Sequence, residues 1–335
     1  MKNMNYLLAA FICLLTINEV TAQENEKKDA FWGNTADYFT QQAAYMFNLV
    51  DQALTDNPPQ QGNSLTRELA LCNLDLLLHD TNNDNSAALL SFLDSRMHKV
   101  IEDLEYEKPQ KIKIYKLYND GFIIHTPSTT VAIDIVRGTC NGRSLIPDSL
   151  MQQIVSFCDI LFITHNHEDH ADAIVAKMFI QANKPVIGPS NLWPDNSNIL
   201  HWRIEDGPLN KQINGLNIKI FPGHQDDLLN NIYLISTKEG KNFIHIGDQY
   251  NENDMEWIKN LRHTVPQPDY LIINCWAYQL PTLVGELNPK CVITGHENEM
   301  GHTIDHREAF WLTFQKMKNI RQPYVVMGWG EWFVE

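Results

Sequence analysis

From Lys111 onward the chain is a succession of short runs rich in β-branched residues, each followed by a turn and often by a helical pattern. Runs of this kind bounded by turn residues are typical of buried β-strands. The sequence predicts strands at 112–118, 130–135, 160–164, 218–221, 232–236, 243–246, 270–274, 292–294 and 324–327. Helical patterns cover 147–157, 169–182 and 304–318. Strands mixed with helices and hairpins favour an α/β layered domain with mixed sheets.

The region before Lys111 has a different character. Apolar residues recur there at helical spacing, as at Leu65, Leu69, Cys72 and Leu76. Asn57-Pro58-Pro59 and the polar stretch 81–86 divide the region into about three helices, and Pro109 ends it. No flexible linker follows. We therefore expect a helical N-terminal region over residues 23–110 that packs directly on a domain formed by residues 111–335.

The first 22 residues have the pattern of a signal peptide. Lys2 supplies a positive charge, an apolar run extends from Tyr6 to Ile17, and Val20-Thr21-Ala22 precedes a possible cleavage point. The run is too short to span a bilayer comfortably, and an uncleaved anchor is the alternative interpretation. We expect an exported protein, periplasmic or extracellular, with no stable transmembrane segment after removal of the leader.

Three histidines and one aspartate lie within six residues, in the run His165-x-His167-x-Asp169-His170. Residues 160–163 predict a buried strand that leads directly into this run, and a helical pattern follows it. Ligands on such a loop are held by rigid elements and stay accessible to substrate. Imidazole suits zinc and iron, and a carboxylate helps to hold a second cation. His165 and His167 point the same way on an extended backbone, so they can bind one ion.

One run cannot complete two metal sites, and three downstream residues are candidates for the remaining ligands. His224, Asp248 and His296 each follow a predicted strand, and each is preceded by a glycine. Glycine permits the sharp turn that directs a side chain at the edge of a sheet. His302 and His306 are alternatives to His296 as the last ligand, and His302 could instead act on the substrate as an acid.

These residues together resemble the metallo-β-lactamase superfamily over roughly residues 111–335. The run His165 to His170 matches that family's H-x-H-x-D-H signature in full, and Asp134 matches an aspartate at the end of an early strand. The resemblance implies an αββα four-layer sandwich, preceded here by the helical extension. Many glyoxalase-II-like members carry glycine at the position of Ala171, so this alanine favours a resemblance to the lactonase-like and phosphodiesterase-like branches. His167, where flavodiiron reductases carry glutamate, counts against a di-iron redox role.

The resemblance also implies a ligand set for two divalent metal ions, zinc with manganese or iron as alternatives. One ion would be bound by His165, His167 and His224, the other by Asp169, His170 and His296, with Asp248 between them. A bridging hydroxide would then attack an ester, lactone, amide or phosphodiester. Asp169 would orient the nucleophile or take its proton, and Asp134 would hydrogen-bond to the ligand loop. An iron-dependent oxidoreductase of the same fold and a non-catalytic, metal-stabilised binding protein are the alternatives.

Charge narrows the range of partners. The chain carries 41 acidic against 26 basic side chains, a formal net charge of −15, and no run of lysine or arginine. Such a surface repels phosphate backbones, so nucleic acid is not expected as a partner. A small-molecule substrate is expected instead, and the sequence indicates no oligomeric state. Five widely spaced cysteines follow the leader without a C-x-x-C pair, which favours free thiols.

Overall fold

The computed structural model describes residues 33–62, 64–106, 109–202 and 208–335, so the predicted leader at 1–22 lies outside the described residues. The chain divides into two compact units, residues 1–45 and 46–335. In the first unit the described residues contain the start of helix α2 (Thr35–Asp56). The rest of α2, both large sheets and the candidate site belong to the second unit.

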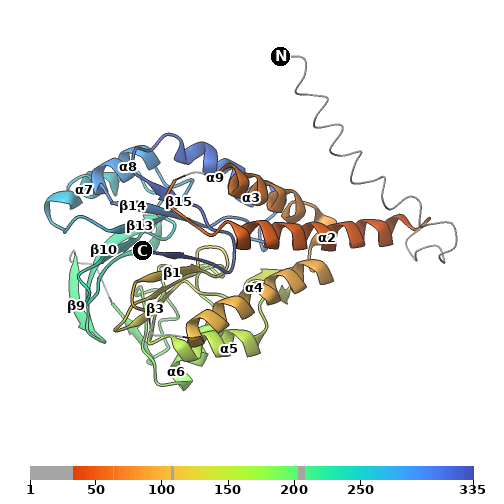
Figure 1. Ribbon diagram of the computed structural model, residues 1–335. Coiled ribbons are helices and arrows are strands. Elements are labelled where there is room, and N and C mark those ends of the chain that lie inside the picture. The colour runs from red at the N-terminus through yellow and green to blue at the C-terminus, as the bar shows by residue number, and fades with distance from the viewer. Residues whose placement is uncertain (1–32, 63, 107–108, 203–207) are drawn as a thin grey trace, which may run out of the picture. The chain divides into compact units, whose positions relative to one another are not determined.

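Two seven-stranded sheets form the centre of the described part of the second unit (Figure 1). The first has the order β16-β1-β2-β3-β6-β7-β8, and the second has the order β15-β14-β13-β12-β11-β10-β9. The first sheet comprises β1 (Lys113–Lys116), β2 (Phe122–His125), β3 (Thr130–Ile133), β6 (Ile160–Phe162), β7 (Val186–Gly188), β8 (Ile199–His201) and β16 (Glu331–Val334). The second comprises β9 (Leu209–Ile213), β10 (Leu216–Gln225), β11 (Leu228–Ser236), β12 (Asn242–His245), β13 (Tyr270–Asn274), β14 (Cys291–Gly295) and β15 (Tyr324–Val325).

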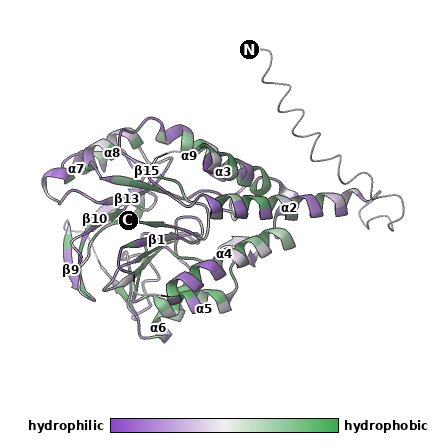
Figure 2. Cartoon of the chain, in the orientation of Figure 1, coloured by the Kyte–Doolittle hydropathy of each residue, from purple (hydrophilic) through white to green (hydrophobic). Residues whose placement is uncertain are grey.

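Apolar side chains fill the space between the two sheets. Ile124 and Phe162 of the first sheet and Tyr233 and Ile293 of the second belong to one buried cluster. Alternate residues of the strands point to opposite faces, so the other face of each sheet is free to pack against helices. Figure 2 shows hydrophobic residues along the strands between the helical layers.

Helices cover the outer face of each sheet. On the first sheet lie α4 (Ala87–Tyr106), α5 (Asp148–Phe157) and α6 (Ala173–Gln181), whose buried residues share a cluster with Ile123 and Leu161. On the second lie α7 (Met255–Ile258) and α8 (Leu280–Leu287), with α9 (Phe310–Met317) and α3 (Leu65–Leu78) beside them (Figure 1). The order of layers is helix, sheet, sheet, helix, which confirms the predicted four-layer sandwich.

The N-terminal helices share the core of the sandwich. Helix α3 buries Leu71, Leu74 and Leu78 in the same cluster as α4 and the first sheet. The stripe of leucines that predicted this helix is its exposed face, since Leu65 and Leu76 are 71% and 72% exposed. A leucine-rich helix offers two apolar stripes, and spacing alone does not show which one meets the core.

Buried polar contacts fix the rotation of α3. The Arg67 guanidinium donates two hydrogen bonds of 2.7 and 2.8 Å to the Glu331 carboxylate on β16. On the same face, the Asp75 carboxylate accepts hydrogen bonds from the backbone N–H groups of Phe310 and Trp311 at the start of α9. Both contacts require this face to turn inward, because either charge would otherwise lose its partner.

The described residues contain five cysteines, all of them free, and four are buried. No helix among the described residues is long and apolar enough to cross a membrane.

Candidate metal centre

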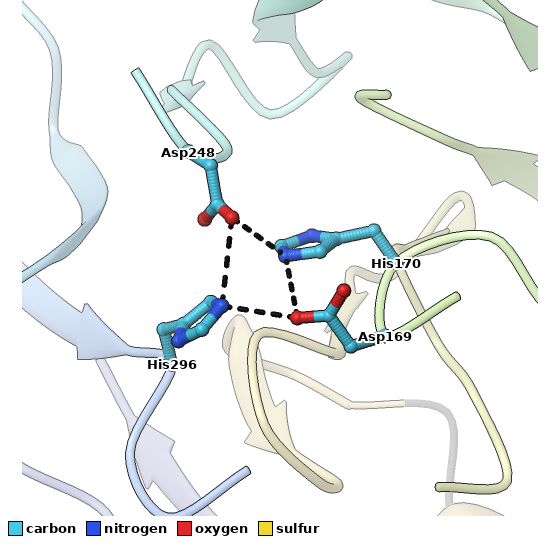
Figure 3. Close-up of side chains that lie close together, drawn as sticks. All are labelled: Asp169, His170, Asp248 and His296. Carbon is cyan, nitrogen blue, oxygen red and sulfur yellow. Dashed lines mark hydrogen bonds and ion pairs between the residues drawn. The ribbon is translucent and has the colours of Figure 1, made fainter. Parts of the chain in front are cut away.

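Six of the seven residues predicted as metal ligands lie together at the carboxyl ends of β6, β12 and β14. One group is Asp169, His170, Asp248 and His296, and the other is His165, His167 and Asp248. Within each group the ligand atoms lie within 4.8 Å of one another, and Asp248 belongs to both. Figure 3 shows the first group, whose four side chains point toward one another from three separate loops.

The start of α6 explains why Asp169 and His170 can face this centre. A helix was predicted from residue 169, but α6 begins at Ala173. The Asp172 carboxylate accepts hydrogen bonds from the backbone N–H groups of Ile174 and Val175, as an N-cap residue does. The loop before Asp172 is therefore not helical.

The first group has the spacing of ligands around a single ion. The Asp169 Oδ2 atom lies 3.5 Å from His170 Nε2 and 3.1 Å from His296 Nε2. Asp248 Oδ2 lies 3.2 Å from His170 Nε2 and 3.5 Å from His296 Nε2. Tetrahedral zinc with bonds near 2.0–2.1 Å separates its ligand atoms by about 3.3 Å. These four distances are close to that value, which fits the binding of a divalent ion.

The second group is less complete. The His165 Nε2 atom lies 3.1 Å from His167 Nδ1 and 3.6 Å from Asp248 Oδ2, again close to the edge of a tetrahedron. His165 is fully buried, whereas His167 is exposed at the surface of the site. Three ligand atoms converge here, so a fourth position is left for another residue, water or substrate.

Hydrogen bonds orient the three buried histidines so that Nε2 faces the centre. The Nδ1 atom of His170 lies 2.9 Å from Asp134 Oδ2, and that of His296 lies 3.1 Å from Glu308 Oε2. His165 Nδ1 lies 3.0 Å from the hydroxyl oxygen of Thr164. Oxygen partners on Nδ1 are the usual means of fixing a metal-binding imidazole. The Nε2 atom of His170 is buried and faces the carboxylates of Asp169 and Asp248, which fits a ligand position.

Charges at the centre are strongly coupled. Burial lowers the pKa of His165 to about 3, so this imidazole is neutral, as a metal ligand must be. Burial alone would raise the pKa of Asp248, but His170 and His296 outweigh it and hold the value well below the ordinary range. Conversely, the carboxylates of Asp248 and Asp169 overcome the effect of burial and raise the pKa of His170 well above its ordinary value.

His224 differs from the expectation, since it belongs to neither group. The predicted turn at Gly223 does not form, because β10 continues as a strand through Gln225 and pairs His224 with Leu229 on β11. The His224 Nδ1 atom lies 3.2 Å from both oxygens of the Asp254 carboxylate. This contact leaves Nε2 as the nitrogen available to an ion.

Apart from Asp134, which the family resemblance implied, the sequence did not identify the residues that support the ligands. Glu308 and Thr164 orient histidines, and the Asn119 amide lies within 3.3 Å of both Asp169 Oδ2 and the Asp169 backbone oxygen. Asn119 stands in a polar pair, Asn119-Asp120, between two buried strands, and that placement was the available signal. The predicted partner, Asp134, is fully buried and also accepts hydrogen bonds from the backbone N–H and the hydroxyl of Thr164.

A third group, Asp120, Asp134 and His245, lies close to the ligands. The His245 Nε2 atom is 3.5 Å from Asp120 Oδ2, and both residues are buried. Burial raises the pKa of Asp120 to about 6. The Asp134 carboxylate is already engaged by Thr164 and His170, so this group supports the centre and does not duplicate it.

No family model matches the sequence, and no curated protein matches it. A metallo hydrolase from the hyperthermophilic archaeon Ignicoccus hospitalis is similar in structure, with 18% identity, a TM-score of 0.50, and coverage of 68% of this chain and 99% of that one. The isothiocyanate hydrolase from Delia radicum gut bacteria matches with 14% identity and a TM-score of 0.50 over 66% of this chain and 98% of its own. Identities this low show similarity of fold alone. The chain has the metallo-β-lactamase fold.

In this metallo-β-lactamase fold a cavity of about 370 Å³ lies over the two groups. Its lining includes the ligand candidates His167, Asp169, Asp248 and His296, together with Gln225, Trp276, His302, Asp305, His306 and Glu308. His302 is exposed, and its ring centre is 6.0 Å from that of His296. Of the three candidates for the last ligand, His296 therefore lies within the centre, and His302 and His306 lie in the cavity wall where a substrate would be.

Proposed function

We propose that this protein is a hydrolase that uses two divalent metal ions, zinc in the first instance with manganese or iron as alternatives, to cleave a small-molecule ester, lactone, amide or phosphodiester. The observation that carries the proposal is the convergence of six candidate ligands into two groups that share the Asp248 carboxylate. Similarity in fold to metallo hydrolases supports the same reaction class. The leader predicted at residues 1–22 would place this activity outside the cytoplasm.

In this proposal Asp169, His170 and His296 bind one ion, and His165 and His167 bind the other with His224 as the third protein ligand. Asp248 lies between the two ions. When bound, the two cations would lower the pKa of a water molecule toward neutrality and polarise the oxygen of the reacting group.

The remaining residues act on the ligands and on the substrate. Asp134 and Glu308 hold the rings of His170 and His296, so that Nε2 needs no reorientation when an ion binds. Asn119 holds Asp169, whose carboxylate lines the cavity and could take a proton from the attacking water. We assign to His302 the return of a proton to the leaving group, because it lines the same cavity, belongs to neither ligand group and has its ring centre 6.0 Å from that of His296.

The test combines metal analysis with a screen for hydrolysis. The chain, expressed with its leader, is assayed for bound metal and for turnover of chromogenic esters, lactones, amides and phosphodiesters. We expect about two ions per chain and turnover that a chelator removes. His167→Ala should lose both the second ion and the activity, whereas His98→Ala, at an exposed position on α4, should lose neither. Absence of bound metal, or a His167→Ala variant that equals the wild type on every substrate, would refute the proposal.

A further inference from the structure

The cavity wall formed by residues 302–308 is acidic. Asp305 is exposed, and a hydrogen bond from the Thr303 side chain lowers its pKa from the ordinary value, so it is charged at neutral pH. Glu308 stands beside it in the lining. None of the residues that line this cavity in the described chain is a lysine or an arginine. The ions would face the reacting atoms, but the rest of a bound substrate would face this negative wall.

The basic residue of this segment does not offset the wall. Arg307 is buried, and its guanidinium donates hydrogen bonds of 3.0 and 3.1 Å to the two oxygens of Asp84. The same group also donates to the backbone oxygens of Leu78 and Met300. The charge of Arg307 is thus neutralised away from the cavity.

An aromatic path leads from the centre into a second acidic hollow. The Trp276 ring lies 5.5 Å from the His296 ring and 5.9 Å from Tyr250, which lies 5.7 Å from Tyr278. Tyr250 and Tyr278 line a neighbouring hollow of about 410 Å³ whose other lining residues are Asp226, Asp227, Asn251, Glu252 and Asn253. Among the described residues, the lining of this second hollow contains three carboxylates and no lysine or arginine. Aromatic faces and carboxylates both attract cations.

We propose that the site selects substrates that carry a cationic substituent away from the reacting group, and that it discriminates against substrates with an anionic substituent there. This proposal rests on the hydrolase function proposed above and specifies its substrate class. In water, one carboxylate at about 7 Å changes the binding of a unit charge by about threefold. Because the effect has opposite signs for a cation and an anion, one such carboxylate separates the two by about tenfold.

The experiment compares three nitrophenyl esters of equal chain length that end in a trimethylammonium, a methyl or a carboxylate group. The kcat/KM values of the metal-loaded enzyme should decrease in that order, with about tenfold between the first and the last at low salt. The difference should shrink at about 1 M salt, where screening acts over about 3 Å. Asp305→Lys should reduce the cation-to-anion ratio by at least about tenfold, because the change removes a negative charge and adds a positive one. Glu102→Lys makes the same change of charge at an exposed position of α4 and should leave the ratio unaltered.

The proposed selectivity would be overturned if the carboxylate ester or the methyl ester were hydrolysed as fast as the trimethylammonium ester, or faster. The hydrolase function would remain intact in that case. An Asp305→Lys variant that folds normally and keeps the wild-type ratio would also overturn the proposed selectivity. Loss of the hydrolase function itself is distinguishable, because no ester would then show turnover that depends on added zinc or manganese.

Discussion

Asp134→Asn is the substitution that most directly tests how the ligand loop is held. The Asp134 side chain is fully buried and uses both oxygens. Its Oδ1 accepts the backbone N–H of Thr164 at 2.8 Å. Its Oδ2 accepts the Thr164 hydroxyl at 2.6 Å and lies 2.9 Å from His170 Nδ1. Asparagine has the same shape, so the change removes charge and one acceptor without opening a cavity.

The expected cost follows from the contacts that asparagine cannot make. If the asparagine oxygen accepts the hydrogen bonds from Thr164 Oγ1 and His170, the asparagine NH₂ group faces the backbone N–H of Thr164. Two buried donors then face each other without an acceptor. An unsatisfied buried donor costs about 1–3 kcal/mol, and a hydrogen bond to a charged group contributes about 1.5–3 kcal/mol. We expect a loss of about 3 kcal/mol in the free energy of unfolding. Since His170 loses its charged partner, metal affinity should also fall about 10–100-fold.

Both quantities can be measured on the same protein. Urea denaturation of the metal-free chain gives the stability, and competition with a chelator gives the metal affinity. Asp159→Asn is a matched control, because Asp159 accepts the backbone N–H of Thr130 at 2.8 Å but is exposed and lies outside both ligand groups. The reasoning is refuted if Asp134→Asn binds metal as tightly as Asp159→Asn does and unfolds at the same urea concentration.

Three further changes probe other contacts. Glu308→Gln keeps an acceptor for His296 Nδ1 but removes its charge, so metal affinity should fall about tenfold in a chelator competition, and an unchanged affinity would contradict the assigned role. Arg67→Met leaves the buried Glu331 carboxylate without its main partner and should cost about 3–5 kcal/mol in urea denaturation; a cost below about 1 kcal/mol would show that the pair is dispensable. Burial raises the pKa of Asp75 from 3.8 to about 6. The folded chain therefore binds the extra proton between these values, and this group's contribution to stability decreases as pH rises through about 4 to 6. The stability advantage of wild type over Asp75→Asn should thus be smaller at pH 7 than at pH 4 by up to about 3 kcal/mol, and equal differences at the two pH values would exclude the effect.

The layers of the fold and most of the centre could be predicted because their signals are local. A buried strand followed by His165-x-His167-x-Asp169-His170 predicts a ligand loop whatever position the strand has in its sheet. The glycine before Asp248 does adopt a positive φ of 52°, as the argument from sharp turns requires. The same argument failed at Gly223, where the hairpin pairing of β10 with β11 extends through His224. Strand length is set by the partner strand, which the local sequence does not report.

Most supporting residues could not be predicted, because their partners are distant in sequence, and Asp134 was expected only on account of the family resemblance. Asn119 reaches Asp169 across 50 positions, and Asp134 reaches His170 across 36. These contacts exist only once the strands are ordered, since parallel neighbours in a sheet bring chain-distant carboxyl ends to one edge. For the same reason, the leucine spacing in α3 predicted a helix correctly without showing which face is buried.

The helices before Lys111 take part in building the centre. His296, His302, Asp305 and Glu308 all belong to the segment between β14 and α9. That segment is held at both ends by residues of the N-terminal helical region. Asp75 on α3 accepts hydrogen bonds from the Asn298 side chain and from the first backbone N–H groups of α9.

Within the segment, the Arg307 guanidinium binds Asp84 and the backbone oxygen of Leu78, and the Arg307 backbone oxygen lies 3.0 Å from His79 Nε2. If the helical region served only to bind a partner, its removal would not change the metal site. Here the last ligand of one metal group and the acidic wall of the cavity depend on it. Removal of residues 65–84 should therefore disrupt the His296 loop itself, because it takes away both of the carboxylates, Asp75 and Asp84, that anchor the loop.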